Sequence, residues 1–155
     1  MERAVAGQES VEVEVERYGE LIKLQLTTAP RDGRRPERLL GWAGTLIQDV
    51  PVEVCQQHGT DATGVYVSAH MPGSPVTRSN LHPTSRIVAV DGQPVTSLDD
   101  FAAAVKEKTD QKTAVRVRSV TLDGQERMST VPLDSEFWKT YKVECVDGQW
   151  QRTEQ

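Results

Sequence analysis

The stretch "RLLGWAGTLIQ", Arg38–Gln48, decides how the rest of the chain is interpreted. Gly41 and Gly44 flank Trp42 directly before an apolar run. Glycine weakens a strand because it costs backbone entropy and has no side chain to pack. We expect a new strand to begin at Arg38, and the two glycines indicate that something at its start requires a bare backbone.

Length and composition narrow the class of protein. The chain has 155 residues, which suits one domain of about 100–150 residues with some sequence left over. Its formal net charge is −5, which argues against nucleic-acid binding, because phosphate binding requires a clustered basic face. No run approaches the roughly 18–20 apolar residues of a membrane span, and the N-terminus has no apolar core of a secretory signal. We therefore expect a soluble intracellular protein, in nucleus, cytoplasm or organelle, with no nucleic-acid and no membrane partner.

No arrangement of residues predicts catalysis or metal binding. The cysteines form no CxxC pair, and the histidines fall in or beside predicted loops without a metal-binding spacing; these residues are Cys55, Cys145, His58, His70 and His82. Ser74 lies between the prolines of a turn and not in the glycine-rich segment that surrounds a serine nucleophile. We therefore expect a chain that is not an enzyme, with no catalytic residue, no metal and no cofactor.

Two segments alternate apolar and polar residues and predict β-hairpins. Val11–Thr28 turns at Tyr18–Glu20, and Thr113–Leu133 turns at Asp123–Gly124. Their similar pattern leaves two interpretations open: the first hairpin closes a preceding domain that is largely absent, or alternating hairpins simply look alike. Alone, the first hairpin would expose an apolar face, so we expect it to pack against the following domain or a second copy of the chain.

The remaining sequence predicts short strands and one main helix. Ser97 is a good N-cap for a helix over Ser97–Lys108, whose apolar residues recur at helical spacing. The other expected elements are a short helix between Pro51 and Gly59, a strand over Thr63–Met71, one helical turn near Val76–Asn80, a strand–turn–strand unit over Arg86–Val95 and a third hairpin turning at Asp147–Gly148.

Several short motifs follow one another in a fixed order after the glycine-flanked strand. They are "GSPV", "NL", "RIV" and "VDGQPV", at Gly73–Val76, Asn80–Leu81, Arg86–Val88 and Val90–Val95, followed by Leu98, Phe101 and Val105. In this order they resemble a PDZ domain of the HtrA/Deg serine-protease type. The resemblance implies a mainly β fold with α (α+β): a PDZ-like, partly open β-barrel or sandwich of five or six strands, capped by one main helix and a short helix.

Two further segments narrow the resemblance. "RLLGWAGTLIQDV" and "DSEFWKTYKVE" look like the C-terminal PDZ region of the large, double-length Deg proteases of plants and the nuclear HtrA-like proteases of fungi. The resemblance covers about Glu37–Arg152. The expected organisation is an N-terminal hairpin over 1–30, a linker over 31–37, a PDZ domain over 38–133, and a C-terminal extension over 134–155 that packs on the PDZ domain.

The resemblance also implies a binding site that would explain the two glycines. A PDZ domain captures the C-terminus of another protein: backbone N–H groups of a loop converge on the carboxylate, and the peptide adds as a strand to a free sheet edge. Three groups of residues follow from it. They are a carboxylate loop of Leu40, Gly41, Trp42 and Ala43, a peptide-pairing strand of Thr45, Leu46 and Ile47, and an apolar pocket of Phe101 and Val105 on the helix.

The function implied is that of a peptide-binding module that captures a hydrophobic C-terminus and regulates, or recruits substrates for, an HtrA/Deg-like serine protease. Its partners would be a C-terminal or extended peptide, a protease domain or another PDZ domain, and further copies of the chain. The alternative is a structural or oligomerisation domain whose groove is occupied by its own or a neighbouring segment. Trp138, Tyr141 and Trp150 need burying, which suits that alternative, and the helix residues could equally be plain core.

Overall fold

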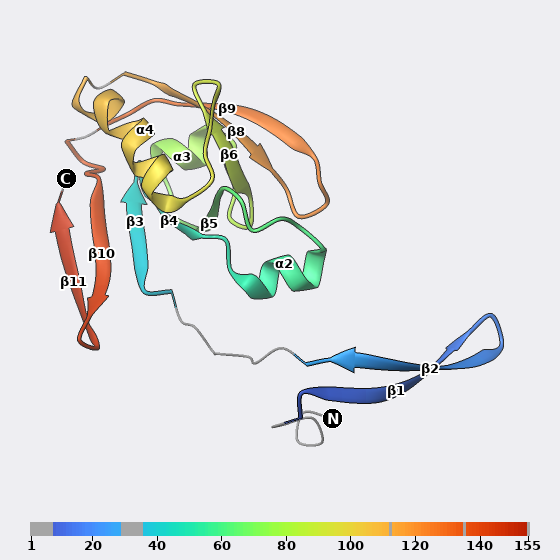
Figure 1. Ribbon diagram of the computed structural model, residues 1–155. Coiled ribbons are helices and arrows are strands. Elements are labelled where there is room, and N and C mark those ends of the chain that lie inside the picture. Colours follow the sequence, from blue (N-terminus) through green and yellow to red (C-terminus); the bar gives the residue numbers. More distant parts are fainter. Residues whose placement is uncertain (1–7, 29–35, 112, 135, 155) are drawn as a thin grey trace. The chain divides into compact units, whose positions relative to one another are not determined.

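The computed structural model describes residues 8–28, 36–111, 113–134 and 136–154 (Figure 1). The chain divides into two compact units, residues 1–35 and residues 36–155. Most of the expected linker, residues 31–35, lies outside the described residues, as do residues 1–7 of the expected N-terminal hairpin region.

The first unit contains the predicted hairpin, which is confirmed. Strand β1 (Ser10–Arg17) pairs antiparallel with β2 (Glu20–Thr27) in a two-stranded sheet. Period-two alternation places valines of β1 opposite aliphatic residues of β2 on one face, as in Val13 opposite Leu24. Leu24 is 43% exposed and Leu26 is 49% exposed, so an apolar face remains in contact with solvent. That this face packs on another surface stays a prediction.

The second unit is built on one sheet with the strand order β11-β10-β3-β4-β5-β6-β8-β9, and the short β7 pairs with β6. The strands are β3 (Arg38–Trp42), β4 (Thr45–Asp49), β5 (Val65–His70), β6 (Arg86–Val90), β7 (Gln93–Pro94), β8 (Val115–Val120), β9 (Glu126–Val131), β10 (Tyr141–Val146) and β11 (Gln149–Glu154). The helices are α2 (Val52–His58), α3 (Pro75–Arg78) and α4 (Leu98–Asp110). The predicted fold class, mainly β with one main helix, is confirmed, and so is the hairpin of β10 and β11.

The stretch Arg38–Gln48 forms two strands. The sequence analysis expected one strand beginning at Arg38, and the resemblance implied a loop over Leu40–Ala43. Residues 40–42 of the expected loop belong to β3, and only Ala43 lies in the turn that joins β3 to β4. Residues 40–42 form a strand because alternate side chains of a strand point to the same face, and this places both Leu40 and Trp42 in the core. Both are at most 1% exposed. The turn residues Ala43 and Gly44 have φ of 49° and 80°, the left-handed pair that a two-residue hairpin requires.

Helix α4 is fixed on the sheet by its cap and by its apolar face. The Ser97 hydroxyl accepts a hydrogen bond from the Asp100 N–H at 3.2 Å, and the Asp49 carboxylate accepts one from the Leu98 N–H at 2.8 Å. These bonds satisfy two of the four unpaired N–H groups at the helix start. On the apolar face, the Phe101 ring meets the Trp42 ring edge-on, with 5.2 Å between centroids. The predicted helix and its N-cap are confirmed.

The cap gives a stability prediction. Ser97→Ala removes the acceptor for the Asp100 N–H, and we expect the free energy of unfolding to fall by about 1 kcal/mol. Ser97→Asp keeps an acceptor at the cap, so its stability is expected to stay within a few tenths of a kcal/mol of the wild type. Urea unfolding of the full chain measures both variants, and equal stability of the alanine and aspartate variants would contradict the role of the cap.

Candidate functional site

The outer edge of β4 is where the sequence analysis expected a peptide to add. In the structure β4 is paired on both sides. Leu40–Trp42 of β3 lie opposite Thr45–Ile47, while β5 pairs with the other edge. Strand β3 is in turn paired with β10, through Gly41 opposite Tyr141. The expected pairing strand therefore has no free edge in this structure.

Strand β3 fills the edge of β4 that β5 leaves open. It runs antiparallel to β4 on the edge opposite β5, and its Trp42 packs against Phe101 of α4. Leu40 is fully buried. Between β3 and α4 there remains a crevice of only about 10 Å³, lined by residues such as Leu40, Leu98 and Ala102. That volume is about the minimum for one water molecule, so β3 and α4 leave no room for a peptide between them.

Phe101 and Val105, the expected peptide pocket, are both fully buried in the core of this unit. Core residues of this kind stabilise a fold by about 1.5–3 kcal/mol each through burial alone. Their proposed contact with a ligand side chain stays a prediction. In this structure Phe101 contacts Trp42 instead.

Arg38 ties the start of β3 to its neighbours. Its guanidinium contacts the Asp99 carboxylate at 2.7 Å and the Asp49 carboxylate at 3.1 Å. The hydrogen bond to Asp99, supported by the charge of Asp49, raises the pKa of Arg38 above its ordinary value. These groups are a third to two thirds exposed, so each pair contributes on the order of 0.2–1 kcal/mol. Sequence reasoning did not assign Arg38 a role, because both partners lie in other elements.

The glycines of β3 and the turn make room for aromatic rings of the C-terminal extension. A Cβ at Gly41 would overlap the ring of Tyr141. A Cβ at Gly44 would overlap Ser74 and lie 2.8 Å from the Trp138 ring, closer than carbon atoms can pack. The bare backbone at both positions therefore lets the extension pack on the β3–β4 hairpin.

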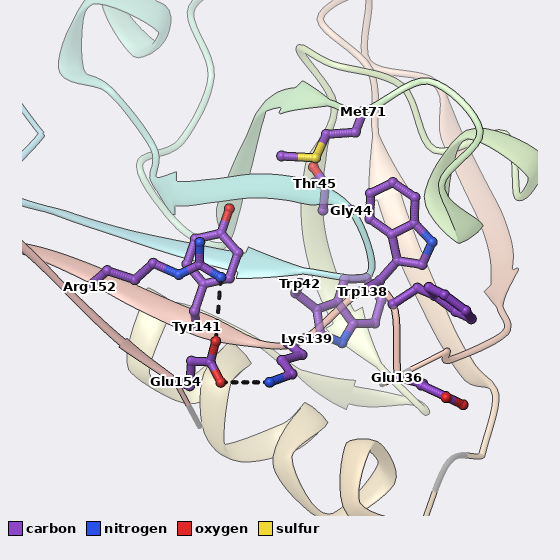
Figure 2. Close-up of a pocket in the computed structure, with 11 residues that line it drawn as sticks. Trp42, Gly44, Thr45, Met71, Glu136, Trp138, Lys139, Tyr141, Arg152 and Glu154 are labelled. Carbon is purple, nitrogen blue, oxygen red and sulfur yellow. Dashed lines mark hydrogen bonds and ion pairs between the residues drawn. The ribbon is translucent and has the colours of Figure 1, made fainter.

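A pocket of about 290 Å³ lies beside the β3–β4 turn (Figure 2). We call it the extension pocket. Its lining residues come from the turn region, from the end of β5 and from the C-terminal extension; they are Trp42, Gly44, Thr45, Met71, Glu136, Phe137, Trp138, Lys139, Tyr141, Arg152 and Glu154. The sequence analysis did not predict this pocket; the aromatic residues of the extension indicated only that this segment packs on the rest of the chain.

Charges gather at one side of the extension pocket. The Lys139 ammonium donates to the Glu154 carboxylate at 3.0 Å, and this hydrogen bond is the main cause that lowers the pKa of Glu154 below its ordinary value. The Arg152 guanidinium lies over the Tyr141 ring, 3.9 Å from the centroid, which is cation–π geometry. Its nearest Glu154 oxygen is 3.8 Å away. Figure 2 shows these contacts together.

The histidines, cysteines and carboxylates of the described residues do not form a metal-binding cluster. Among residues 8–28, 36–111, 113–134 and 136–154, no three His, Cys, Asp or Glu side chains come together as metal ligands. His70 and His82 are neighbours, with 6.5 Å between ring centroids, and His82 contacts Asn80 at 2.6 Å. Both cysteines are free thiols. Within the described helices, none is long and apolar enough to cross a membrane.

Comparison with known proteins agrees with this architecture. A family model described as "PDZ-like domain" matches residues 35–111. The chain is 33% identical over 138 residues to Protease Do-like 7 of Arabidopsis thaliana, covering 87% of this chain and 12% of that protein. It is 35% identical over 113 residues to the pro-apoptotic serine protease nma111 of Aspergillus terreus, covering 73% of this chain and 11% of that protein.

A solved structure is also similar. The crystal structure of the HtrA3 PDZ domain bound to a phage-derived ligand (FGRWV) superposes with a TM-score of 0.48 at 14% sequence identity, covering 61% of this chain and 86% of that chain. The chain thus spans about an eighth or less of the length of the curated relatives that it matches.

The packing of Tyr141 on Gly41 gives a second prediction. Gly41→Ala forces the added methyl group into the ring, and we expect a loss of about 1–3 kcal/mol in unfolding free energy. In a Tyr141→Ala background the ring is absent, so the same substitution is expected to cost nothing or to stabilise slightly through the unfolded chain. Urea unfolding of the four proteins of this double-mutant cycle measures the coupling. If the losses in unfolding free energy from the two substitutions simply add, the packing of the Tyr141 ring does not depend on the glycine at position 41.

Proposed function

Because the chain belongs to the PDZ domains of the HtrA/Deg serine-protease family, we propose that it is a structural interaction module of such a protease whose peptide groove is closed by its own strand β3. The single observation that carries this proposal is the pairing of β4 on both edges, with β3 on the side where a peptide would add.

A free peptide competes poorly with β3 for the same edge. An incoming peptide would replace the backbone hydrogen bonds and apolar contacts of β3 with others of the same kind. Its binding would therefore gain little free energy. Strand β3 is joined to β4 by two residues, Ala43 and Gly44, which gives it an effective concentration of roughly millimolar or more at the edge. A ligand at micromolar concentration does not overcome that advantage.

The C-terminal extension strengthens the closure from the other side. Strand β10 pairs with β3, and the rings of Tyr141 and Trp138 pack where the glycines leave room. Displacing β3 would therefore also break its pairing with β10. A closed module of this kind acts through its outer surfaces, on a protease domain, another PDZ domain or a further copy of the chain.

Capture of a hydrophobic C-terminus by strand addition is the second candidate function. It is favoured by family membership, and the HtrA3 PDZ domain was solved with a phage-derived ligand. For this chain it requires β3 to leave the edge of β4. A regulatory role would follow if another event, such as binding to the extension, released that strand.

Hydrogen exchange separates the two candidates. In a two-residue hairpin the two residues that flank the turn are joined by two backbone hydrogen bonds, and every second pair along the ladder repeats this pattern. Trp42–Thr45 and Leu40–Ile47 are such pairs, so the N–H groups of Thr45 and Ile47 point at β3. We expect slow exchange of both amides in the free protein, measured by NMR, at rates typical of central strands. Those N–H groups of β11 that point away from β10 are the internal control and are expected to exchange fast, since β11 is the edge of the sheet.

The same sample is then titrated with a peptide that ends in a hydrophobic residue with a free carboxylate. We expect no shift of the Ile47 amide or of the Ala102 amide on α4 up to about 1 mM, because the groove between them is filled. Fast exchange at Thr45 and Ile47, together with saturable shifts of Ile47 and Ala102, would establish peptide capture and overturn the closed-groove proposal.

A further inference from the structure

We propose that the outer edge of β11 binds a second copy of the chain, whose own β11 adds antiparallel about a two-fold axis. Trp150 of each copy then lies opposite Arg152 of the other copy. This inference deepens the proposed function, on which it rests, because it names one outer surface of the closed module and the partner at that surface. It needs no movement of β3.

Strand β11 is the last strand of the sheet, and β10 pairs with only one of its edges (Figure 1). The two-residue turn at Asp147–Gly148 fixes which backbone groups face β10. In an antiparallel ladder every second residue is hydrogen-bonded to the neighbouring strand, so the N–H and C=O groups of Trp150, Arg152 and Glu154 point away from β10. Within the described part of the chain, no strand pairs with them.

A hydrogen bond on the other side of β10 supports this assignment. Cys145 lies directly opposite Trp150, and its N–H donates to the Glu37 carbonyl at 2.7 Å. The backbone groups of Cys145 therefore face away from β11, as in a pair of opposite residues that are not hydrogen-bonded to each other. Trp150, the other member of that pair, turns its backbone groups outward by the same rule.

The outer edge of β11 lacks the features by which edge strands avoid pairing with another chain. Such features are Pro, Lys, a β-bulge or a covering segment. The sequence of β11 is QWQRTE, and all six residues pair with β10 without a register shift. All six are exposed. The edge is therefore regular and accessible, and a further strand can pair along its length.

The order of side chains along β11 is complementary to itself when the strand is reversed. With Gln151 on the two-fold axis, Trp150 lies opposite Arg152 of the second copy, and Gln149 lies opposite Thr153 of the second copy. Each pairing occurs twice, once on either side of the axis. No like charges of the two β11 strands lie opposite each other, and two cross-strand contacts between Trp and Arg form.

Both members of this contact are accessible on the single chain. Trp150 is 51% exposed, and the Arg152 side chain is 56% exposed. They share the face of the sheet that carries Tyr141, because alternate residues of a strand point to one face. One side of the Arg152 guanidinium already lies over the Tyr141 ring, 3.9 Å from its centroid. Trp150 of the second copy would contact the same cation from across the axis, and Trp and Arg are the residue types that contribute most at interfaces.

Other two-fold registers fit less well. An axis at Arg152 would place two guanidinium groups opposite each other, which is destabilising. An axis at Thr153 would pair Arg152 with Glu154 but leave Trp150 outside the paired part of β11, and an axis at Trp150 would pair only the first residues of the strand. The axis at Gln151 pairs both the aromatic ring and the cation.

The interface is small, so we expect a weak dimer. A single pair of edge strands falls below the roughly 1,200 Å² of stable interfaces, and we expect a dissociation constant on the order of 0.1–1 mM. When about half of the chains are monomeric, hydrogen exchange of the outward amides of β11 slows only about twofold, because exchange proceeds from the open state. These amides therefore stay fast in comparison with those of central strands.

Sedimentation equilibrium of the full chain, between about 10 µM and about 2 mM, tests the association. We expect a reversible equilibrium of monomer and dimer with no larger species, because two-fold pairing occupies the β11 edge of both copies and closes. Pairing of β11 with β9 of another copy would instead build open chains, seen as a mass that keeps growing with concentration.

Charge-exchange variants make the test specific. Trp150→Lys places a lysine opposite Arg152 at both contacts, and we expect the dissociation constant to rise about tenfold. Combining it with Arg152→Glu places opposite charges there, which is expected to restore the constant to within about threefold of the wild type. Met128→Lys is the matched control and should change nothing, because Met128 is a 62% exposed apolar residue on β9, at the other end of the sheet.

Disulfide cross-linking tests the register. The two Gln151 residues would be a pair that is not hydrogen-bonded, with Cα atoms about 4.5 Å apart, within the range that a disulfide spans. With Cys55 and Cys145 replaced by Ser, Gln151→Cys is expected to give a covalent dimer when diamide oxidises the thiols. Gln149→Cys is the control, because its two copies would lie about 14 Å apart along the strands.

Four results would overturn the proposal. They are a monomer at about 2 mM, growth into open chains, equal dissociation constants for Trp150→Lys and the wild type, and cross-linking of Gln149→Cys as efficient as that of Gln151→Cys. Hydrogen exchange of Thr45 and Ile47 reports on the closed groove in the same samples. A monomer with slow exchange there would leave the closed groove intact, so failure of the dimer and failure of the proposed function can be told apart.

Discussion

Strand β3 is held along both edges, by β4 on one side and β10 on the other, and the arrangement of the second unit depends on this double pairing. A strand in the middle of a sheet has all its backbone groups satisfied and its side chains sorted to two faces. Leu40 and Trp42 thereby reach the core beneath α4, and Gly41 on the opposite face receives Tyr141. The core, the edge of β4 and the C-terminal extension therefore all contact the five residues of β3, Arg38–Trp42.

Much of this fold could be predicted from local sequence. Period-two alternation identified the hairpins, and Ser97 with its helical pattern identified α4, because these signals lie within one element. The glycines at positions 41 and 44 correctly indicated a need for bare backbone. Their partners could not be found, since Tyr141 and Trp138 lie about a hundred residues further along the chain and only the fold brings them together.

The candidate site shows the same limit. A free edge at Thr45–Ile47 was inferred by resemblance, and nothing in those residues records whether a neighbouring strand occupies that edge. The alternation of Leu40 and Trp42 was the one local sign that β3 is itself a strand. The extension pocket could not be predicted, because its walls come from three separate segments. The aromatic residues of the extension predicted burial without indicating a place, and for Trp150, which is 51% exposed, that prediction is wrong.

The position of Arg38 has a mechanical consequence. The chain that leaves the first unit enters the second at β3, and Arg38 stands at that entry, clamped to Asp49 and Asp99. A force on the chain ahead of Arg38 that acts across the strands would break the hydrogen bonds of β3 one at a time, starting from that end. The two ion pairs lie where such tension would first act, so the strand that fills the groove is secured at the point where peeling would start.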